Sequence, residues 1–287
     1  MTFVEVDQLA ICYGRRSVLE GIGFHVSPGD VYALLGRNGA GKSSLVRCLL
    51  GWQKPKHGAV RLFGKNAWNH RAKAMERTGV VPENPDLPPR LCISELAAFC
   101  ARLYPRFDEA GFRTRVDRCG VSMKDKAGSL SRGQKAQVAL ALALAPSPDL
   151  LVLDDPTLGL DAVARRTFFE SLVVDLAERG VTVLLTTHDL AGAEGVADRV
   201  GILHGGKLIC DESFEGLKAS LRRLRWTEGL PDLAEHHVLR RSYGAFGGEA
   251  IVAGWREELA IPGLRAEPLS LEEAFIALTD EGLEVRA

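Results

Sequence analysis

The chain has 287 residues, a net charge of −1, and ordinary fractions of hydrophobic (46%) and charged (25%) residues. This length allows one large core and a modest appendage, because single hydrophobic cores stop growing at about 250–300 residues. The near-neutral charge argues against a dedicated nucleic-acid binder, which usually carries a basic stripe and a high pI. We therefore expect a globular protein without a nucleic-acid partner.

The six cysteines predict reduced thiols in the cytosol, several of them in the core. They are widely spaced and form no C-x-x-C pair. A metal site would need clustered ligands, and a disulfide framework is typical of a short secreted chain. The cysteines are Cys12, Cys48, Cys92, Cys100, Cys119 and Cys210.

The sequence predicts neither a targeting peptide nor a membrane span. The first seven residues include acidic side chains where a signal peptide needs a basic flank and an apolar run. The most apolar helix-like run, residues 138–145, is far shorter than the roughly 20 residues that cross a bilayer, and Pro146 ends it. If the protein works at a membrane, we expect another subunit to supply the span.

The first part of the chain reads as short strands followed by a strand, a loop and a helix. Residues 3–6 and 21–26 have strand patterns and are followed by a turn signal. The continuous apolar run at 31–35 predicts a strand that is covered on both faces. A helix is expected over 42–50, with Gly51 as its end.

The next part, about residues 85–147, predicts a helical insertion. Helical spacing extends over 94–103, with Ser94 as the expected N-cap, and again over 132–145. Strand patterns then return at 150–153 and 181–186, with a helix over 165–179 between them. Such alternation indicates an α/β fold with a largely parallel sheet.

A hairpin is expected at residues 200–209, because its central Gly-Gly pair supplies the positive φ angles of a two-residue turn. Beyond it we predict a helix over 215–224, strands near 238–239 and 250–252, and a final helix from Ser270 to 278. The basic cluster Arg222-Arg223-Leu224-Arg225 suits a solvated helix end, with contact to acidic lipid as the alternative.

The strongest chemical motif is a match to G-x-x-x-x-G-K-[ST] at residues 36–43. Successive backbone N–H groups and a helix N-terminus wrap a polyphosphate in such a loop, and glycine allows close approach. Lys42 is expected to contact the outer phosphates and the Ser43 hydroxyl to bind Mg²⁺. The candidate nucleotide-binding residues of this segment are Gly36, Arg37, Asn38, Gly39, Ala40, Gly41, Lys42, Ser43 and Ser44.

A second motif is the apolar strand at 150–153 that ends in Asp154 and Asp155. Carboxylates at the carboxyl end of a buried parallel strand lie where such sheets bind ligands. Asp154 is the expected Mg²⁺ ligand, because hard cations prefer oxygen.

Three further motifs follow the phosphate loop: L-S-R-G-Q at 130–134, G-L-D at 159–161 and T-H-D at 187–189. With the phosphate loop and the strand that ends at Asp154, they resemble the motifs of the ATP-binding cassette ATPases of ABC transporters, and they occur in the same order as in that family. The resemblance covers residues 1 to about 211. It implies a P-loop NTPase core with a largely parallel sheet, an antiparallel β subdomain and a helical insertion. We assign 1–213 to this nucleotide-binding domain and 214–287 to a small C-terminal α+β extension.

The resemblance also implies roles for residues outside the phosphate loop. Tyr13 matches the aromatic residue that stacks on adenine, although a Tyr beside a strand also suits packing. Two cassettes would close head to tail over two ATPs, so that Ser131 and Gly133 of one chain face the γ-phosphate of the other. His188 would contact the γ-phosphate and the attacking water. Further residues expected at the nucleotide or the dimer seam are Gln134 and Asp161.

Asp155 stands where the family usually has the Glu that orients or deprotonates the attacking water. Removing one methylene withdraws the carboxylate by about 1.5 Å, and general-base assistance is worth about 10²–10⁴ in rate. We therefore expect slow but real hydrolysis.

Two further positions depart from the family pattern. Glu83 replaces a common Gln that links the Mg²⁺ site to the segment touching the membrane subunit. Its carboxylate would bind Mg²⁺ more strongly, and one hypothesis is that it compensates for the short Asp155 by holding water. Arg132 replaces a usual Gly, and two readings stay open: attraction toward the γ-phosphate, or exposure to solvent.

The sequence thus predicts an ATP- and Mg²⁺-dependent ATPase subunit of a membrane exporter. We expect a homodimer, or a pair with a similar chain, docked on a separate transmembrane permease at the inner face of the cell membrane. The end of the chain resembles the short extension of drug- and polysaccharide-type exporter ATPases. The alternatives are an ATP-gated clamp that scarcely hydrolyses, and a soluble ABC ATPase of translation or repair, whose relatives usually carry two cassettes or a long coiled coil.

Overall fold

A computed structural model describes residues 2–227, 233, 237–244, 247–255 and 264–280. The chain divides into two compact units, Met1–Leu208 and Ile209–Ala287.

The first unit is built on a parallel sheet whose strands follow the order β10-β9-β3-β8-β7-β6. Pairing is parallel from β9 through β3, β8 and β7 to β6. The strands of this parallel part are β3 (Val31–Gly36), β6 (Thr78–Val81), β7 (Leu150–Asp154), β8 (Thr182–Thr187) and β9 (Arg199–His204). Strand β3 is buried along its whole length, which confirms the expectation of a strand covered on both faces at 31–35, and β8 is equally buried.

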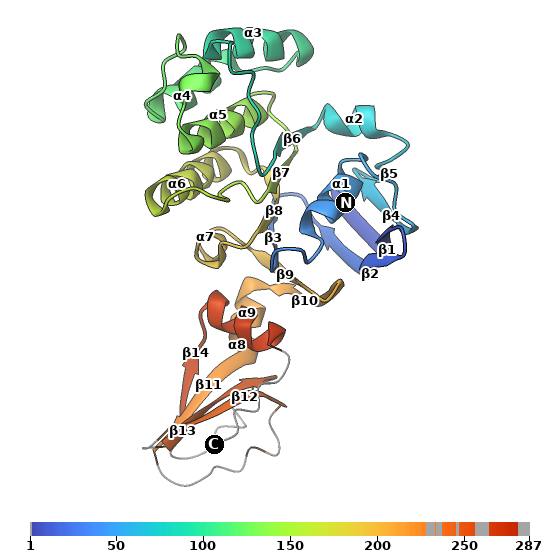
Figure 1. Ribbon diagram of the computed structural model, residues 1–287, viewed down its shortest axis with the longest axis vertical. Helices are drawn as coiled ribbons and strands as arrows, with labels where there is room; N and C mark the ends of the chain where they lie inside the picture. Colours follow the sequence, from blue (N-terminus) through green and yellow to red (C-terminus); the bar gives the residue numbers. More distant parts are fainter. Residues whose placement is uncertain (1, 228–232, 234–236, 245–246, 256–263, 281–287) are drawn as a thin grey trace. The chain divides into compact units, whose positions relative to one another are not determined.

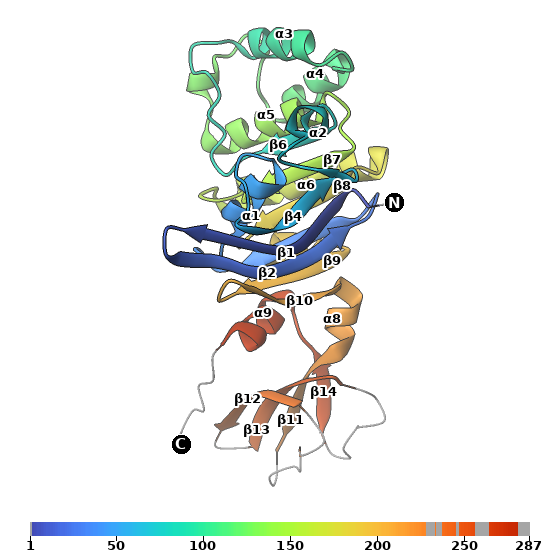
Figure 2. The ribbon, with the colours of Figure 1, turned by 90° about the vertical axis from the view of Figure 1, so that its right-hand side faces the viewer.

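A second, antiparallel sheet in this unit has the order β2-β1-β4-β5. Its strands are β1 (Val4–Tyr13), β2 (Arg16–Val26), β4 (His57–Leu62) and β5 (Lys65–Asn66). Helix α1 (Lys42–Leu49) contacts β4 as well as β3 and β7, so it packs between the two sheets. Figure 1 shows this sheet and α1 on one side of the parallel strands, and α5, α6 and α7 on the other; Figure 2 views the unit from the antiparallel side.

The expected helical insertion is present and has its own apolar core. It contains α3 (Ile93–Leu103), α4 (Glu109–Arg118), the 3₁₀ turn η1 (Ala127–Ser129) and α5 (Arg132–Leu144). The predicted N-cap Ser94 is wrong. Cys92 caps α3, because Glu95 at the third helical position accepts a hydrogen bond from the Cys92 N–H and completes a capping box.

Helix α6 (Ala162–Arg179) begins three residues earlier than predicted, because Asp161 caps it by accepting a hydrogen bond from the Ala164 N–H. An ion pair between Arg115 on α4 and Asp175 on α6 joins the insertion to the core. Both Nε and Nη2 of Arg115 donate to Oδ1 of Asp175, at 2.8 and 2.6 Å, and both side chains are buried. Helix α7 (Leu190–Glu194) and the short α2 (Arg71–Met75) complete this unit's helices among the described residues.

The predicted hairpin is confirmed: β9 turns through Gly205 and Gly206, whose φ angles are 54° and 77°, into β10 (Lys207–Ser213). The second unit contains a four-stranded antiparallel sheet in the order β12-β13-β11-β14. Its elements are α8 (Phe214–Ser220), β11 (Leu221–Trp226), β12 (His237–Gly244), β13 (Gly247–Ala253), β14 (Arg265–Pro268) and α9 (Leu271–Thr279).

The predicted helix over 215–224 is wrong in its second half. Helix α8 ends at Ser220, and the basic cluster forms β11 rather than a helix end. There Arg223 pairs with Glu273 of α9 at 2.6 Å, and Arg225 pairs with Glu267 of β14 at 3.1 Å. These two arginines therefore join β11 to α9 and β14 by ion pairs.

The six cysteines are free thiols. Within the part of the chain that the structure describes, no helix is both long enough and apolar enough to cross a membrane.

We expect Asp175→Ala to lower the free energy of unfolding by about 3–5 kcal/mol, because it leaves the buried Arg115 guanidinium unpaired. Chemical unfolding followed by circular dichroism measures the loss. The matched control is Glu170→Ala, which breaks the exposed Arg166–Glu170 pair on α6 and should leave the curve unchanged. Equal effects of the two variants would contradict the assigned role of the buried pair.

Candidate functional site

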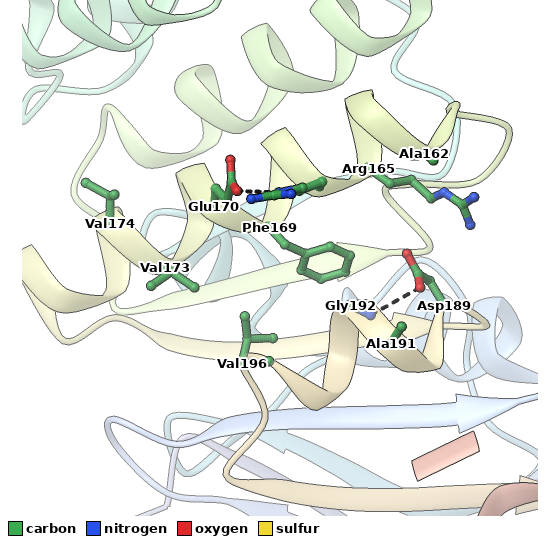
Figure 3. A pocket seen from close by; sticks show the side chains of 12 residues that line it. Ala162, Arg165, Phe169, Glu170, Val173, Val174, Asp189, Ala191, Gly192 and Val196 are labelled. Atoms are coloured by element: carbon green, nitrogen blue, oxygen red, sulfur yellow. Dashed lines mark hydrogen bonds and ion pairs between the residues drawn. The ribbon is translucent and has the colours of Figure 1, made fainter. Parts of the chain in front are cut away.

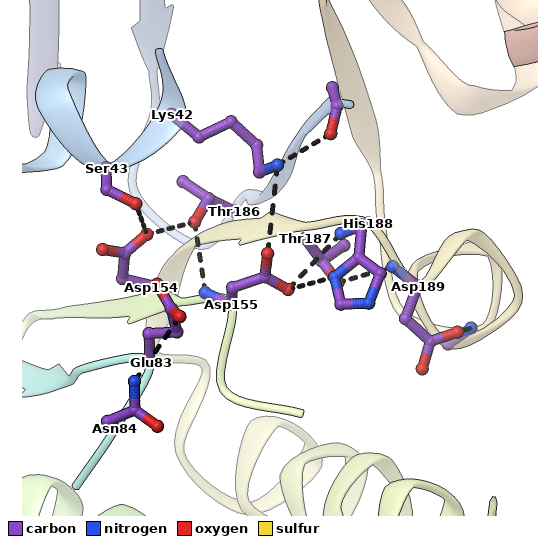
Figure 4. A network of polar contacts seen from close by, with 12 residues as sticks. Lys42, Ser43, Glu83, Asn84, Asp154, Asp155, Thr186, Thr187, His188 and Asp189 are labelled. Atoms are coloured by element: carbon purple, nitrogen blue, oxygen red, sulfur yellow. Dashed lines mark hydrogen bonds and ion pairs between the residues drawn. The ribbon is translucent and has the colours of Figure 1, made fainter. Parts of the chain in front are cut away.

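The candidate site lies at the carboxyl ends of four neighbouring parallel strands. The phosphate loop follows β3, Glu83 follows β6, Asp154 ends β7, and His188 follows β8. Open α/β sheets bind ligands at this edge, since loops that are distant in sequence meet there. Figure 4 shows these side chains converging on one space.

The phosphate loop runs from the buried strand β3 into α1. Gly39 and Gly41 have φ angles of 84° and 105°, which L side chains rarely adopt, and Gly41 immediately precedes the helix. Lys42 is 6% exposed, and its Nζ donates to the Gly36 carbonyl at 2.7 Å. Burial lowers the pKa of Lys42, while the nearby carboxylates of Asp155, Asp154 and Glu83 act in the opposite direction. An anionic phosphate would stabilise this poorly solvated ammonium further.

Asp154 is held by two hydroxyl groups. Its Oδ1 accepts from Thr186 Oγ1 at 2.7 Å and from Ser43 Oγ at 3.4 Å. Ser43 and Asp154 thus bring a hydroxyl and a carboxylate oxygen together beside the phosphate loop. Mg²⁺ is commonly bound by one or two such protein oxygens, with phosphates and water completing the shell. The donor set of this site fits that ion.

Asp155 is buried and adopts a φ angle of 47°, which is uncommon for a residue other than glycine but tolerated by Asp. Its N–H donates to the carbonyl of Thr186 at 2.8 Å, which fixes the bend after β7. The side chain lies between a cation and an imidazole: Oδ2 is 3.9 Å from Lys42 Nζ, and Oδ1 is 2.7 Å from His188 Nδ1. Within the described residues, the carboxylate is therefore engaged by two other candidate site residues.

A cavity of about 390 Å³ is lined both by Tyr13, the residue expected to stack on adenine, and by residues of the phosphate loop. Tyr13, at the end of β1, is 46% exposed, and its hydroxyl contacts Ser44 Oγ at 3.2 Å and donates to Gln53 Oε1 at 2.8 Å. The predicted residues that line the cavity are Tyr13, Asn38, Gly39, Ala40, Gly41, Lys42, Ser43, Ser44, Glu83 and Asp155. Arg37 instead lines an adjacent cavity on the side of the β9–β10 turn.

Three further predicted residues, Gly36, Asp154 and His188, do not line the cavity but each contacts a residue that does. Four others lie away from it. Ser131 caps α5 by accepting from the Gln134 N–H at 3.2 Å, and the Gln134 side chain accepts from the Ser131 N–H at 3.0 Å. Gly133 follows in the first turn of α5, and Asp161 caps α6. A single chain does not bring Ser131, Gly133, Gln134 or Asp161 to the residues that line the cavity.

A larger cavity, of about 730 Å³, lies between α6 and α7. Figure 3 shows Phe169, Val173 and Val196 around it, with Arg165 and Asp189 among the polar side chains. Asp189 accepts a hydrogen bond from the Gly192 N–H at 3.2 Å, which accounts for its position. The residues lining this cavity include none of the predicted site residues, so volume alone does not mark the candidate site.

Comparison with known proteins agrees with this geometry. A family profile described as "ABC transporter" matches residues 19–158. The Nod factor export ATP-binding protein I of Paraburkholderia xenovorans is 36% identical over 229 residues, which cover 76% of this chain and 73% of that protein. The chain belongs to the ABC transporter family. It is an ATP-binding subunit, an ATPase coupled to transport.

Other members of the family support the same assignment. The bacitracin transport ATP-binding protein BcrA of Bacillus licheniformis is 32% identical, with 77% of this chain and 73% of that protein covered. A solved ATP-binding subunit of an ABC transporter aligns with a TM-score of 0.66 at 30% identity, over 76% of this chain and 92% of that one. The cbiO1 protein of Clostridium perfringens, part of the transporter complex cbiONQ, aligns with a TM-score of 0.63 at 30% identity, over 74% and 88%.

Sequence reasoning missed Thr186 as a site residue. Its hydroxyl donates to Asp154 Oδ1 and accepts from the Asp155 N–H at 3.2 Å, so it orients both acidic residues of this ABC ATPase. The register that pairs Thr186 with Asp154 across β7 and β8 sets this contact. A threonine near the carboxyl end of a buried strand, shortly before the predicted His188, is the signal in the sequence, but its partner is decided by the register.

We expect Thr186→Val to raise the Mg²⁺ concentration needed for half-maximal ATPase activity by about tenfold or more, as loss of a residue that orients a metal ligand commonly does. The change preserves side-chain shape and removes the hydroxyl. Magnesium titration of the ATPase rate provides the measurement. Thr167→Val is the control, because that hydroxyl bonds within α6 to the Val163 carbonyl; an unchanged titration for Thr186→Val would refute the role.

Proposed function

We propose that this protein binds Mg²⁺-ATP at the carboxyl edge of its parallel sheet and hydrolyses it slowly to power export through a separate transmembrane permease. The convergence of Lys42, Ser43, Asp154, Asp155 and His188 carries the proposal, because it supplies phosphate-binding, metal-binding and water-orienting groups in one space. Export is supported by the name of the Nod factor export relatives.

Each group has a distinct task in this proposal. Lys42 and the loop amides hold the phosphates, and Tyr13 provides a surface for adenine. Ser43 and Asp154 hold Mg²⁺, with Glu83 beside them at the same cavity. The bound metal neutralises charge on the transferred phosphoryl group. Asp155 orients the attacking water, and His188 fixes that carboxylate through its Nδ1.

The contacts of Asp155 support slow hydrolysis. Its carboxylate is buried and bonded to His188, and it carries one methylene fewer than the usual Glu. A carboxylate held at that depth reaches water on the γ-phosphate less readily than a longer side chain. The same observation supports the second candidate function, an ATP-gated clamp that scarcely hydrolyses.

A head-to-tail dimer explains the four residues that lie away from the cavity. Ser131 and Gly133 stand at the N-terminus of the 13-residue helix α5, where backbone N–H groups and the helix dipole favour an anion. We place the γ-phosphate of a partner chain there, and Asp161 at the seam. Homodimers and pairs with a similar chain both satisfy this arrangement.

The helical insertion is the proposed docking face for the permease. On α3, Phe99 and Leu103 are 60% and 59% exposed and lie one helical turn apart, so they form an apolar pair on the surface. Such an exposed pair suits an apolar segment of a membrane protein. Docking through the insertion would hold the chain at the inner face of the cell membrane.

We expect Asp155→Glu to raise the ATPase turnover by about tenfold or more, because a longer carboxylate regains part of the general-base contribution. Steady-state phosphate release with purified protein measures the turnover, and Asp155→Asn supplies the background. An unchanged rate in Asp155→Glu would show that geometry at this position is not limiting. Wild-type activity no higher than that of Asp155→Asn, with the permease present, would favour the clamp.

A matched pair of variants distinguishes the role of Glu83 from that of Asp155, with steady-state phosphate release as the measurement. If Glu83 compensates for the short Asp155 by holding water, Glu83→Gln and Asp155→Asn both abolish hydrolysis. Loss of hydrolysis in Asp155→Asn alone would eliminate the compensation hypothesis.

We expect Asp155→Asn to form a dimer of twice the 31.1 kDa chain mass when Mg²⁺-ATP is added, because nucleotide is bound but not cleaved. Size-exclusion chromatography with light scattering detects it. The companion variant Ser131→Asp in the same background retains an N-cap side chain but places a negative charge against the partner's phosphate. A dimer that survives this change would exclude the head-to-tail arrangement.

A further inference from the structure

Arg132 is exposed, as one of the two readings of the sequence expects, and its guanidinium also contacts two neighbouring segments. Its Nη2 donates to Oδ1 of Asn84 at 3.0 Å. Its Nη1 lies against Gly159, where an added β-carbon would collide with it. The side chain therefore spans from the first residue of α5 to the segment after β6 and to the loop after β7.

Asn84 extends this contact to Glu83. Its Nδ2 donates to Glu83 Oε1 at 3.5 Å, and Figure 4 shows Glu83 lying between Asn84 and Asp154. A guanidinium group only donates hydrogen bonds, and an ionised carboxylate only accepts them. The Asn84 amide presents an oxygen to the first and an NH₂ group to the second. It is thus suited to bridge Arg132 and Glu83, whereas Asp at this position would lose the bond to Glu83 and Leu would lose both bonds.

The bridge joins two departures from the family pattern that carry opposite charges. Glu83 adds a negative charge beside Lys42 at the phosphate cavity, and Arg132 adds a positive charge at the other end of the same chain of contacts. The two charges are separated by one amide group, so each is partly compensated by the other.

In the proposed head-to-tail dimer, on which this inference rests, Glu83 and Arg132 lie next to different nucleotides. Glu83 lines the cavity of its own chain. Ser131 and Gly133, which flank Arg132, would face the phosphate of the partner's nucleotide. A displacement at one nucleotide would therefore reach the other through Arg132 and Asn84.

We propose that Arg132 is a positioning residue that couples the two ATP sites of the dimer through Asn84 and Glu83. Occupation of the partner's site fixes the start of α5, Arg132 then fixes Asn84, and Asn84 holds the Glu83 carboxylate at its own chain's phosphate cavity. Coupling of this kind is reciprocal, so binding at either site strengthens binding at the other.

The experiment measures ATP hydrolysis by the full chain as a function of ATP concentration. We expect a Hill coefficient above 1 for the wild type. Arg132→Ala should reduce the Hill coefficient to about 1 and raise KM by about two- to tenfold, the size expected for losing one ordinary, solvent-exposed hydrogen bond, with a smaller effect on kcat. Arg132→Lys retains a donor and should restore part of the cooperativity.

Asn84→Leu tests the route independently of Arg132 and of helix α5. It should reproduce the loss of cooperativity, and the double variant Arg132→Ala/Asn84→Leu should be no worse than either single variant. Arg113→Ala, a change at an exposed position on α4, is the control for loss of a surface arginine. Thermal melting of each variant separates coupling from loss of the fold.

The outcomes distinguish this inference from the proposed function. A wild type that hydrolyses ATP and dimerises, but has a Hill coefficient of 1, overturns the coupling alone. Independent, additive effects of the Arg132 and Asn84 variants, or an effect of Arg132→Ala without one of Asn84→Leu, overturn the Asn84 route. Failure of Asp155→Asn to dimerise with Mg²⁺-ATP instead removes the dimer on which the inference stands.

Discussion

The charged group formed by the buried Lys42 and Asp155 and the half-buried Asp154 is the constraint on which the rest of the site depends. An ammonium and a carboxylate that are both more than nine-tenths buried persist only when each has partners, since the desolvation of an isolated charge is costly. Here Lys42 has the Gly36 carbonyl and the Asp155 carboxylate, and Asp154 has two hydroxyl groups. The phosphate loop, the end of β7 and the end of β8 are fixed to one another by these contacts.

Three departures from the family pattern lie in or next to this group. The short Asp155 side chain is engaged by Lys42 and His188 inside the site. Glu83 adds a second carboxylate at the cavity, and Arg132 adds a cation that reaches it through Asn84. The substitutions are parts of one electrostatic arrangement, and the properties of any one of them depend on the others.

The small second unit illustrates the same dependence on pairing. Its arginines on β11 lie opposite glutamates on β13, β14 and α9, and Arg223 contacts two of these glutamates. The pattern of local residues favoured a helix for this segment because a basic cluster follows a helical run. The ion-pair partners of these arginines, which are 24 to 50 residues away in the chain, accompany a strand.

The sequence by itself determined the local chemistry of this protein. The wholly apolar strand before the phosphate loop, the glycines that need positive φ angles, the Gly-Gly hairpin and the Ser131 and Ser270 caps all follow from neighbours within a few residues. The order of the motifs was enough to place the chain among ABC transporter ATPases. Such features can be predicted from the sequence because backbone sterics and helix capping involve only residues within one turn or one strand of each other.

Only the tertiary structure decided which of those residues meet. Register placed the Thr186 hydroxyl on Asp154, and the packing of β6, α5 and the loop after β7 placed the exposed Arg132 side chain on Asn84. The pairing of Arg115 with Asp175 was equally invisible in the sequence. These contacts join residues 32 to 60 positions apart, and their formation depends on strand register and helix packing that no local pattern encodes.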